Sequence, residues 1–265
     1  MKSLLIKPGS RFRASDIDPD DTSLAPGDKT RTAAVSEKLQ ARIGELQELL
    51  YAGHHHKLLV ILQGMDTSGK DGTIRHVLCD TTPQNIRVVA FKKPTEHELD
   101  HDYLWRVHQE VPGASEIVVF NRSHYEDVLI VRVHGFVPRA AWRKRYDQIN
   151  DFERMLSENG VTILKFFLHI SRDEQRERLQ ERLDDPTKRW KFQEGDLDER
   201  KLWNDYMRAY EDAITKTSTK WAPWIVVPAN RKWYRNWVVA SAITDALEKL
   251  DMEYPKPDLS KISVE

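Results

Sequence analysis

Five short runs of apolar residues alternate with longer amphipathic stretches along the chain. The runs lie at residues 57–63, 86–91, 116–120, 162–169 and 224–227. Continuous apolar runs of this length are typical of strands that are buried on both faces of a sheet. Because a stretch with helical spacing follows each run, the pattern predicts an α/β fold in which helices flank a five-stranded parallel sheet.

The ends of the chain have a different character from its middle. Residues 1–29 are rich in Asp, Pro, Gly and Ser and are expected to form an extended arm on the surface. A first helix is predicted at 30–52, where Ile43 and Leu46 belong to an apolar face with helical spacing. Residues 251–265 are expected to form an extended tail. The chain between them, 30–250, is therefore predicted to be a single domain.

The first apolar run leads into a glycine-spaced loop, Gly64-Met65-Asp66-Thr67-Ser68-Gly69-Lys70-Asp71-Gly72. The spacing of its glycines and lysine is that of a P-loop, whose backbone N–H groups and lysine bind phosphate. Asp71 departs from that motif, because a Ser or Thr that ligates Mg²⁺ usually follows the lysine. Its carboxylate also suits the N-terminus of the helix that follows. The residues expected to contact phosphate here are Gly64, Ser68, Gly69, Lys70, Asp71 and Gly72.

Acidic residues near this loop need an explanation, because a carboxylate that faces phosphate is unfavourable unless a cation lies between them. Asp66 lies inside the loop. The third apolar run ends in Asn121-Arg122-Ser123-His124-Tyr125-Glu126-Asp127, where P-loop proteins place a metal-associated acid. Arg122 and Asp127 are therefore candidate site residues. Glu126 has two interpretations, since it can also complete a helix cap with Ser123.

Basic residues follow the second and fourth runs. Lys92 and Lys93 lie at the end of the second run, where they either line the ligand crevice or are solvated surface residues. Arg178 and Arg182 are four residues apart and share one face of a predicted helix. A basic, aromatic and turn-rich stretch follows and includes Lys188, Arg189, Trp190 and Lys191. It predicts a lid at about 178–200 that closes over phosphates, with an ordinary charged helical hairpin as the alternative.

The composition excludes several classes of protein. The chain has 41 basic and 42 acidic residues, so no global positive field indicates nucleic-acid binding. A single cysteine excludes an internal disulfide and suits a reducing cytoplasm. No apolar run approaches the ~18 residues of a membrane span, and no signal-peptide core is present at the start. A cytoplasmic protein without membrane association is expected.

Together, the strings GMDTSGKDG at 64–72 and FNRSHYED at 120–127 resemble the polyphosphate kinase 2 family. The resemblance extends to YLWR at 103–106, KFFLH at 165–169, RWK at 189–191 and WYRNW at 233–237. It covers roughly residues 30–250. The length of the chain and its acidic N-terminal arm are most similar to the class III members.

This resemblance implies a P-loop kinase core similar to thymidylate kinase, with a helical lid. It implies reversible phosphoryl transfer between inorganic polyphosphate and nucleoside mono- or diphosphates, from AMP and ADP to ADP and ATP, and with guanine nucleotides also as substrates. It further implies a requirement for Mg²⁺ or Mn²⁺ and assembly into homodimers or homotetramers.

The predicted residues suit this chemistry, because phosphoryl transfer depends on positioning and charge neutralisation. Asp66 and Asp127 are predicted to hold the metal, although either acid can instead orient or deprotonate the acceptor. Glu126 is a candidate for selecting mono- over diphosphate acceptors. The residues expected to neutralise the transferred phosphate are Lys70, Arg122, Arg178, Arg182, Lys188 and Arg189. Those expected to line a polyphosphate channel are Lys92, Lys93 and Arg132, with Trp190 and Lys191 in the lid.

Two other functions share these features. An ATP-dependent nucleoside or nucleoside-monophosphate kinase has the same loop, sheet and lid but a closed base pocket in place of a basic channel. A non-catalytic module that binds polyanions or nucleotides also needs a phosphate-binding loop. The acidic residues Asp66 and Asp127 argue against such a module, because binding alone gains nothing from acids beside phosphates.

Overall fold

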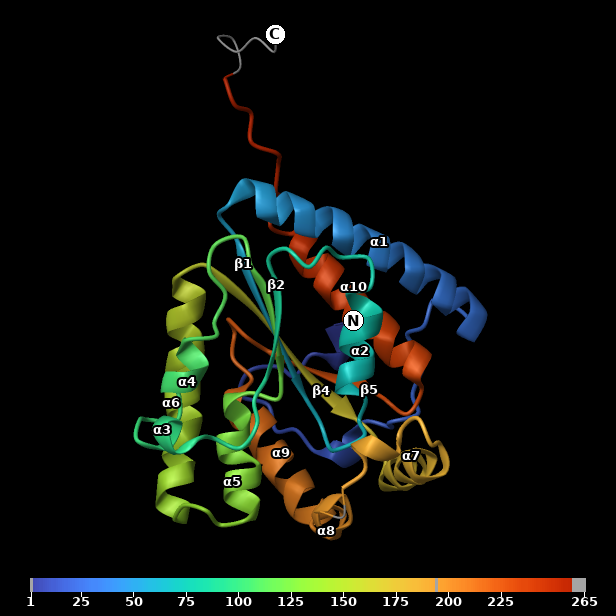
Figure 1. Cartoon of the computed structure of the whole chain (residues 1–265), viewed down its shortest axis with the longest axis vertical. Coiled ribbons are helices and arrows are strands. Elements are labelled where there is room, and N and C mark those ends of the chain that lie inside the picture. Colours follow the sequence, from blue (N-terminus) through green and yellow to red (C-terminus); the bar gives the residue numbers. More distant parts are fainter. Residues whose placement is uncertain (1, 194, 259–265) are drawn as a thin grey trace.

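A computed structural model describes residues 2–193 and 195–258 of the chain. Its centre is a five-stranded, fully parallel sheet with the strand order β2-β3-β1-β4-β5 (Figure 1). The predicted α/β fold is confirmed, and strand boundaries differ from the predicted ones by at most one residue. The strands are β1 (Lys57–Gln63), β2 (Ile86–Ala90), β3 (Ile117–Asn121), β4 (Val161–His169) and β5 (Trp224–Pro228).

The strand order fixes where a ligand can bind. The chain passes from β1 to β2 and β3 on one side of the sheet, and then crosses to β4 and β5 on the other. A crevice forms at such a reversal, beyond the carboxyl ends of the strands. Because Leu62 of β1 is in register with Asn121 of β3, the segments that follow these two strands emerge side by side.

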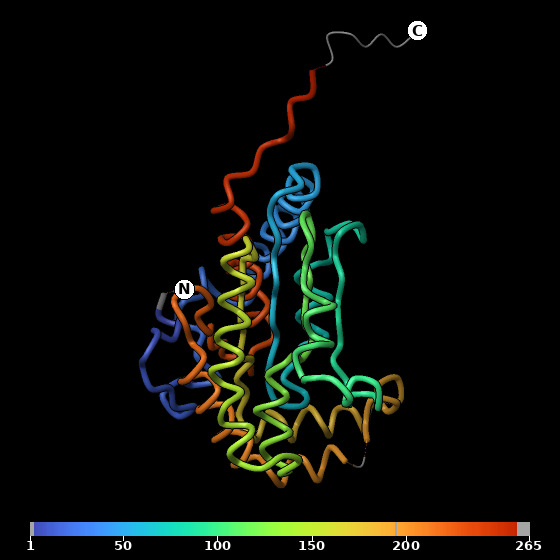
Figure 2. The backbone as a smooth tube through the Cα atoms, turned by 90° about the vertical axis from the view of Figure 1, so that its left-hand side faces the viewer, coloured from blue at the N-terminus to red at the C-terminus, as the bar shows by residue number. Residues whose placement is uncertain are grey.

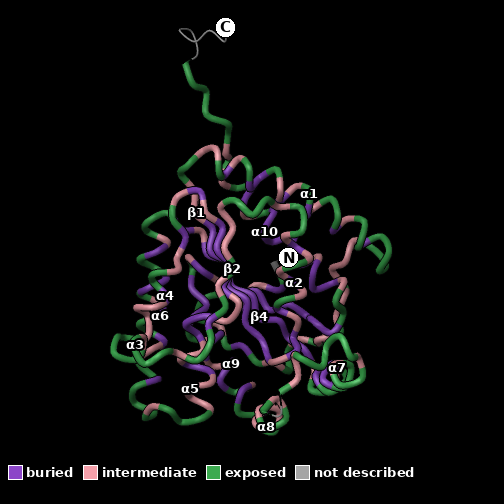
Figure 3. The backbone as a smooth tube through the Cα atoms, in the orientation of Figure 1, coloured by how far each residue is buried: buried purple, intermediate pink, exposed green. Residues whose placement is uncertain are grey.

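Helices cover both faces of the sheet. Figure 1 shows α1 (Lys29–Gly53), α2 (Lys70–Val77) and α10 (Lys232–Glu248) together on one side, with α1 lying over α10. The other side carries α6 (Arg139–Glu158) and α9 (Trp203–Thr217), with the short helices α4 (Trp105–His108) and α5 (Ile130–Val133). In Figure 3 the strands β1, β3, β4 and β5 are largely buried. The edge strand β2 has no buried residue, so the expectation that this run is buried on both faces is wrong.

The stretch from Thr95 to His108 forms two short helices. Thr95 and Glu98 form a capping box at the start of α3 (Glu96–Leu99). The carboxylate of Asp102 then accepts hydrogen bonds from the backbone N–H groups of Leu104 and Trp105. An acidic side chain that caps the chain in this way starts a new turn, so α4 begins separately.

Two further helices lie at the carboxyl edge of the sheet, at the lower end of Figures 1 and 2. They are α7 (Arg172–Asp184) and α8 (Gly195–Lys201), joined through a short 3₁₀ helix at Arg189–Lys191. This is the segment predicted as a lid, of which residue 194 lies outside the described residues. Further 3₁₀ helices lie at Lys2–Leu4, Ala14–Asp16 and His124–Val128.

The N-terminal arm contributes to the core. Leu5 makes an antiparallel bridge with Ile225, and Phe12 is buried against Phe167. The tail from 251 to 258 is mostly exposed and points away from the sheet, and 259–265 lie outside the described residues. Within the described chain, none of the helices has the length and apolar character needed to cross a bilayer.

Candidate active site

The glycine-spaced loop connects β1 to α2. Gly69 has φ +99°, a conformation that few residues other than glycine adopt, and a Cβ there would overlap the guanidinium of Arg235. Lys70 is the first residue of α2, and its ammonium donates to the Gly64 carbonyl at 2.8 Å. Burial, together with the positive charge of Arg122, lowers the pKa of Lys70 to about 8. The lysine therefore lies inside the loop, where an anion would favour its charged form.

Arg122 reaches this loop from the end of β3. Its backbone has φ +63°, which is unusual for a residue with a side chain and is typical of functional positions. Its guanidinium donates to Asp66 Oδ1 at 2.6 Å. Burial raises the pKa of Asp66, but the positive charges of Arg122 and Lys70 outweigh it and leave that pKa below its ordinary value. Asp66 is therefore ionised at neutral pH.

Two cavities meet at this ion pair. The larger, about 680 Å³, is called the basic cavity. It is lined by loop residues, by the ends of β2 and β3, and by α7 and the lid. The smaller, about 400 Å³, is called the tyrosine cavity and is lined by Gly64, Glu126, Tyr206 and Tyr210 among others. The residues that line both are Asp66, Arg122, Arg182, Lys191 and Gln193.

The two cavities differ in charge. Ten Lys and Arg residues and three acidic residues line the basic cavity. Three Lys and Arg residues and four acidic residues line the tyrosine cavity. The basic cavity is therefore suited to a polyanion that carries many negative charges, whereas the tyrosine cavity suits a ligand of lower charge density.

Glu126 and Asp127 point in different directions, and of the two only Glu126 lines a cavity together with Asp66, whereas the prediction paired Asp66 with Asp127. Asp127 lines neither cavity, because its carboxylate accepts from Arg145 at 2.8 Å. Glu126 lines the tyrosine cavity together with Asp66. In the orientation of the Gln63 amide that satisfies both its nitrogen and its oxygen, the nitrogen donates to Glu126 Oε1 at 3.1 Å. The acid that accompanies Asp66 is thus Glu126.

Metal binding here has to rely partly on the substrate. No group of three or more His, Cys, Asp or Glu side chains with the geometry to hold a metal occurs among the described residues. Asp66 and Glu126 line one cavity. Burial raises the pKa of Glu126 although the positive charges of Arg122 and Lys70 oppose the shift, and the negative charge of Asp66 adds to it. A divalent cation would relieve that repulsion, and Mg²⁺ commonly binds through one or two carboxylates, with phosphates and water completing its shell. The residues present therefore fit such a cation.

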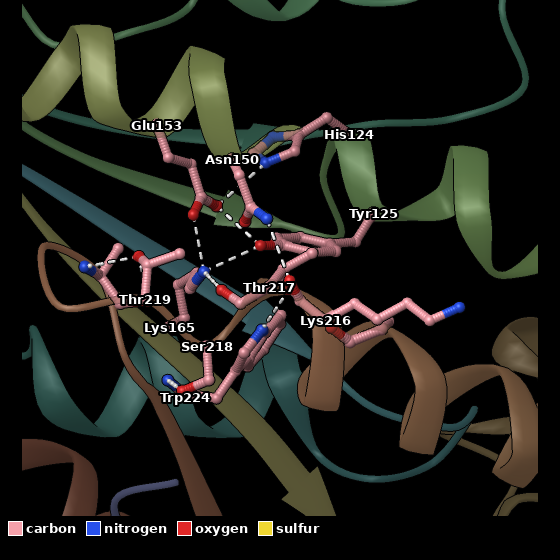
Figure 4. Close-up of polar contacts among 12 residues, drawn as sticks. His124, Tyr125, Asn150, Glu153, Lys165, Lys216, Thr217, Ser218, Thr219 and Trp224 are labelled. Carbon is pink, nitrogen blue, oxygen red and sulfur yellow. Dashed lines mark hydrogen bonds and ion pairs between the residues drawn. The ribbon is translucent and has the colours of Figure 1, made fainter. Parts of the chain in front are cut away.

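A buried polar network anchors the turn that carries Glu126 (Figure 4). Lys165 of β4 donates to Glu153 of α6 at 2.6 Å and to the hydroxyl of Tyr125 at 2.9 Å. That hydroxyl donates in turn to Glu153 at 2.8 Å, and the His124 ring lies 3.3 Å from the same carboxylate. The positive charge of Lys165 holds the pKa of Glu153 below its ordinary value despite burial. Because a buried ion pair needs all these partners, the turn is held in one conformation.

Several predicted residues lie outside both cavities. Arg132 pairs with Asp212 at 2.7 Å and lines neither cavity, so its place in a polyphosphate channel stays a prediction. Arg189 donates to the Leu183 carbonyl, and Trp190 is 77% exposed on the outside of the lid. Ser68 is fully buried behind the loop. The predicted residues that line the basic cavity are Asp66, Gly69, Lys70, Asp71, Gly72, Lys92, Lys93, Arg122, Arg178, Arg182, Lys188 and Lys191.

Arg178 has a different environment from its neighbours in the basic cavity. It is 6% exposed, and its guanidinium donates to the carbonyls of Thr67, Ser68, Ala229 and Asn230 while pairing with Glu174. Most of its N–H groups are therefore occupied by protein. Arg178 therefore stabilises the phosphate loop and has few N–H groups left to donate to a ligand.

The sequence interpretation missed residues that line these cavities. Arg75 and Lys232 add charge to the basic cavity. Tyr206 and Tyr210 both line the tyrosine cavity, and their spacing of four residues on α9 places them on one face, a signal that was available in the sequence. Asp196 and Glu199 of α8 are three residues apart and also share a face, but only the fold shows that this helix lies over the cavity.

Comparisons with known proteins agree on one family. The sequence model of the family described as polyphosphate kinase 2 matches residues 27–255. An AMP/ADP-polyphosphate phosphotransferase from Meiothermus ruber is 56% identical, over the full length of both chains. An ADP-polyphosphate phosphotransferase from Rhodopseudomonas palustris is 47% identical, over 81% of this chain and 78% of that one. The crystal structure of polyphosphate kinase 2 from Arthrobacter aurescens TC1 superposes with a TM-score of 0.93 at 48% identity, covering 97% of this chain and 92% of that one.

Proposed function

Because this chain belongs to the polyphosphate kinase 2 family, we propose that it is a phosphotransferase that moves a phosphoryl group between inorganic polyphosphate and a nucleotide. In the forward direction a terminal P–O bond of the polyphosphate breaks. A new bond forms from that phosphorus to an oxygen of the nucleotide's last phosphate. A nucleotide phosphate is already an oxyanion at neutral pH, so the reaction needs little help from a general base.

The observation that carries this proposal is the pair of cavities that meet at Asp66 and Arg122. A polyphosphate chain carries about one negative charge per phosphate, which matches the excess of Lys and Arg in the basic cavity. The nucleotide takes the tyrosine cavity. The two substrates then approach each other in line at the shared residues, as phosphoryl transfer requires.

The residues at the junction would act through charge and position. Lys70 and Arg122 neutralise the transferred group, and Arg182 and Lys191 cover it from α7 and the lid. Asp66 and Glu126 would hold a divalent cation, for which we propose Mg²⁺. Such a cation supplies positive charge between the phosphates of donor and acceptor.

The finer features of the proposal come from its relatives. The Meiothermus ruber protein is named for both AMP and ADP. We propose that the present chain is a class III enzyme, which phosphorylates both AMP and ADP. Residues 30–250 act as one domain with a lid at about 178–200. The protein is proposed to work in the cytoplasm as a homodimer or homotetramer, which light scattering after gel filtration would measure.

The direct test uses long-chain polyphosphate with ADP, and separately with AMP, in the presence of Mg²⁺. ATP is read by luminescence and ADP by chromatography. We expect product in both assays and none without the cation. Turnover with ATP and a nucleoside but not with polyphosphate would identify an ATP-dependent kinase instead. Tight polyphosphate binding without transfer under any metal would identify a binding module.

A further inference from the structure

Arg235 lies directly beneath the phosphate loop but lines neither cavity. It is 3% exposed and comes from the first turns of α10. Its guanidinium donates to the Ser68 carbonyl at 3.2 Å and to Oδ1 of Asn236 at 3.1 and 2.8 Å. It also lies against Gly69, where even a Cβ would overlap it. The loop and this guanidinium therefore fit each other closely.

The charge of Arg235 is poorly compensated in the free protein. Over 2–193 and 195–258 no carboxylate forms an ion pair with it, whereas the neighbouring Arg178 pairs with Glu174 at 2.7 Å. The guanidinium lies below Gly69 and Gly72, at the N-terminus of α2, where the helix dipole is already positive. Burial and the charge of Arg178 lower the pKa of Arg235 to about 9. An isolated buried cation in such a place is unfavourable.

An anion bound at the phosphate loop would compensate the positive charge of Arg235. Lys70 of the loop lines the basic cavity, and Arg235 donates to the Ser68 carbonyl of the same loop without lining either cavity. A negative charge a few ångströms away interacts strongly across a protein interior of low dielectric constant, even without direct contact.

We propose that Arg235 is a positioning residue for the polyphosphate donor: together with Arg178 it fixes the Ser68 carbonyl, and it supplies a buried positive charge that only a bound anion compensates. This inference rests on the proposed function, because it takes the anion to be polyphosphate. It adds that the phosphate loop is strained electrostatically when empty and is stabilised when donor binds.

The test compares two substitutions at one position. Arg235→Gln keeps a hydrogen-bond donor but removes the charge, whereas Arg235→Lys keeps the charge. Tripolyphosphate binding is measured by titration calorimetry, and kinetics with long-chain polyphosphate give KM and kcat separately. We expect Arg235→Gln to weaken tripolyphosphate binding and raise the polyphosphate KM by roughly tenfold, with a smaller change in kcat. Arg235→Lys should stay within about threefold of wild type.

A matched control separates positioning from mere stability. Ile243→Ala removes a buried side chain about two turns further along α10 and destabilises the fold without touching the loop. It should lower the melting temperature but leave the tripolyphosphate Kd unchanged. Wild-type affinity in Arg235→Gln, or a wild-type protein that does not bind tripolyphosphate, would overturn the proposal.

Two further outcomes are also decisive. If Arg235→Gln does not fold, Asn236→Ala frees the guanidinium from its acceptor and should weaken binding at least about threefold, so an unchanged Kd would contradict the proposal. If tripolyphosphate affinity depends on Arg235 but the wild-type protein transfers no phosphate from polyphosphate, the inference stands and the proposed function fails.

Discussion

At the scale of single residues, the site depends on charges held out of water. Lys70 is 8% exposed and its ammonium faces backbone carbonyls and Arg122, so it is charged only at some energetic expense. The charged form of Asp66, in contrast, is favoured, because the positive charges of Arg122 and Lys70 keep its carboxylate ionised. Such opposed environments are common where phosphate charge has to be neutralised.

Lys70 makes anion binding depend on pH. Its pKa in the folded protein is about 8, against 10.5 ordinarily. Tripolyphosphate affinity should therefore fall as pH rises above 8, by at most about tenfold per pH unit. Calorimetry between pH 7 and 9.5 measures this, and Lys70→Met corrects for titration of the ligand itself. Equal slopes in the two proteins would remove Lys70 from the explanation.

The lowered pKa of Lys70 also makes the free energy of unfolding depend on pH. Between pH 8 and 10.5 the unfolded chain binds the lysine proton and the folded chain does not. The contribution of Lys70 to the free energy of unfolding therefore rises with pH across that window.

Glu126 and Asp127 should differ as mutants. Glu126→Gln removes a carboxylate from the tyrosine cavity and should lower kcat by about a hundredfold or more, with a weaker dependence on Mg²⁺. Asp127→Asn leaves an acceptor for Arg145 outside the cavities and should change kcat less than about tenfold. Steady-state assays across Mg²⁺ concentrations measure both. The reverse ranking would restore Asp127 as the metal-associated acid.

At the scale of elements, one 3₁₀ turn links the catalytic edge of the sheet to its core. The turn His124–Val128 follows β3, and its first residues are fixed by side chains from α6 and β4. Its direction is therefore set by contacts with the buried side chains of α6 and β4.

Tyr125→Phe tests that link. Loss of one hydroxyl leaves Glu153 and Lys165 each short of a partner and should destabilise the fold by about 1–3 kcal/mol. Because the turn is then less fixed, the nucleotide KM should rise several-fold more than the polyphosphate KM. Urea unfolding and steady-state kinetics measure the two effects.

The matched control is Tyr146→Phe, which removes a buried hydroxyl that bonds Arg132. It should change stability without changing the ratio of the two KM values. An equal change of that ratio in both variants would contradict the positioning role of the turn.

At the scale of the whole molecule, the arm before α1 is integrated with the far edge of the sheet. Besides the bridge to β5, the Asn230 side chain donates to Asp20 at 2.7 Å, and its backbone N–H donates to the Pro19 carbonyl at 3.1 Å. Asn230 follows β5 and precedes α10, the helix that carries Arg235. The arm thus supports the segment behind the phosphate loop.

Phe12→Ala measures what the arm contributes. Phe12 is 3% exposed and packs edge-on against Phe167, so its truncation should lower the free energy of unfolding by about 3–5 kcal/mol. The exposed Arg13→Ala change is the control and should alter stability by less than about 0.5 kcal/mol. Equal urea midpoints for Phe12→Ala and wild type would show that the arm does not contribute to the core.

The five strands, their parallel arrangement and the phosphate loop could be predicted from the sequence, because apolar runs and glycine spacing are local patterns. Which side chains meet depends on the packing of elements that are far apart in the chain. Glu126 and Asp127 are adjacent in sequence, yet one lines the tyrosine cavity and the other pairs with Arg145. The turn that carries them is fixed through Tyr125 by Glu153 and Lys165, which are 28 and 40 residues from that tyrosine. Arg235 reaches the loop across 167 residues. No local periodicity records contacts of that range, since they form only when the helices close around the sheet.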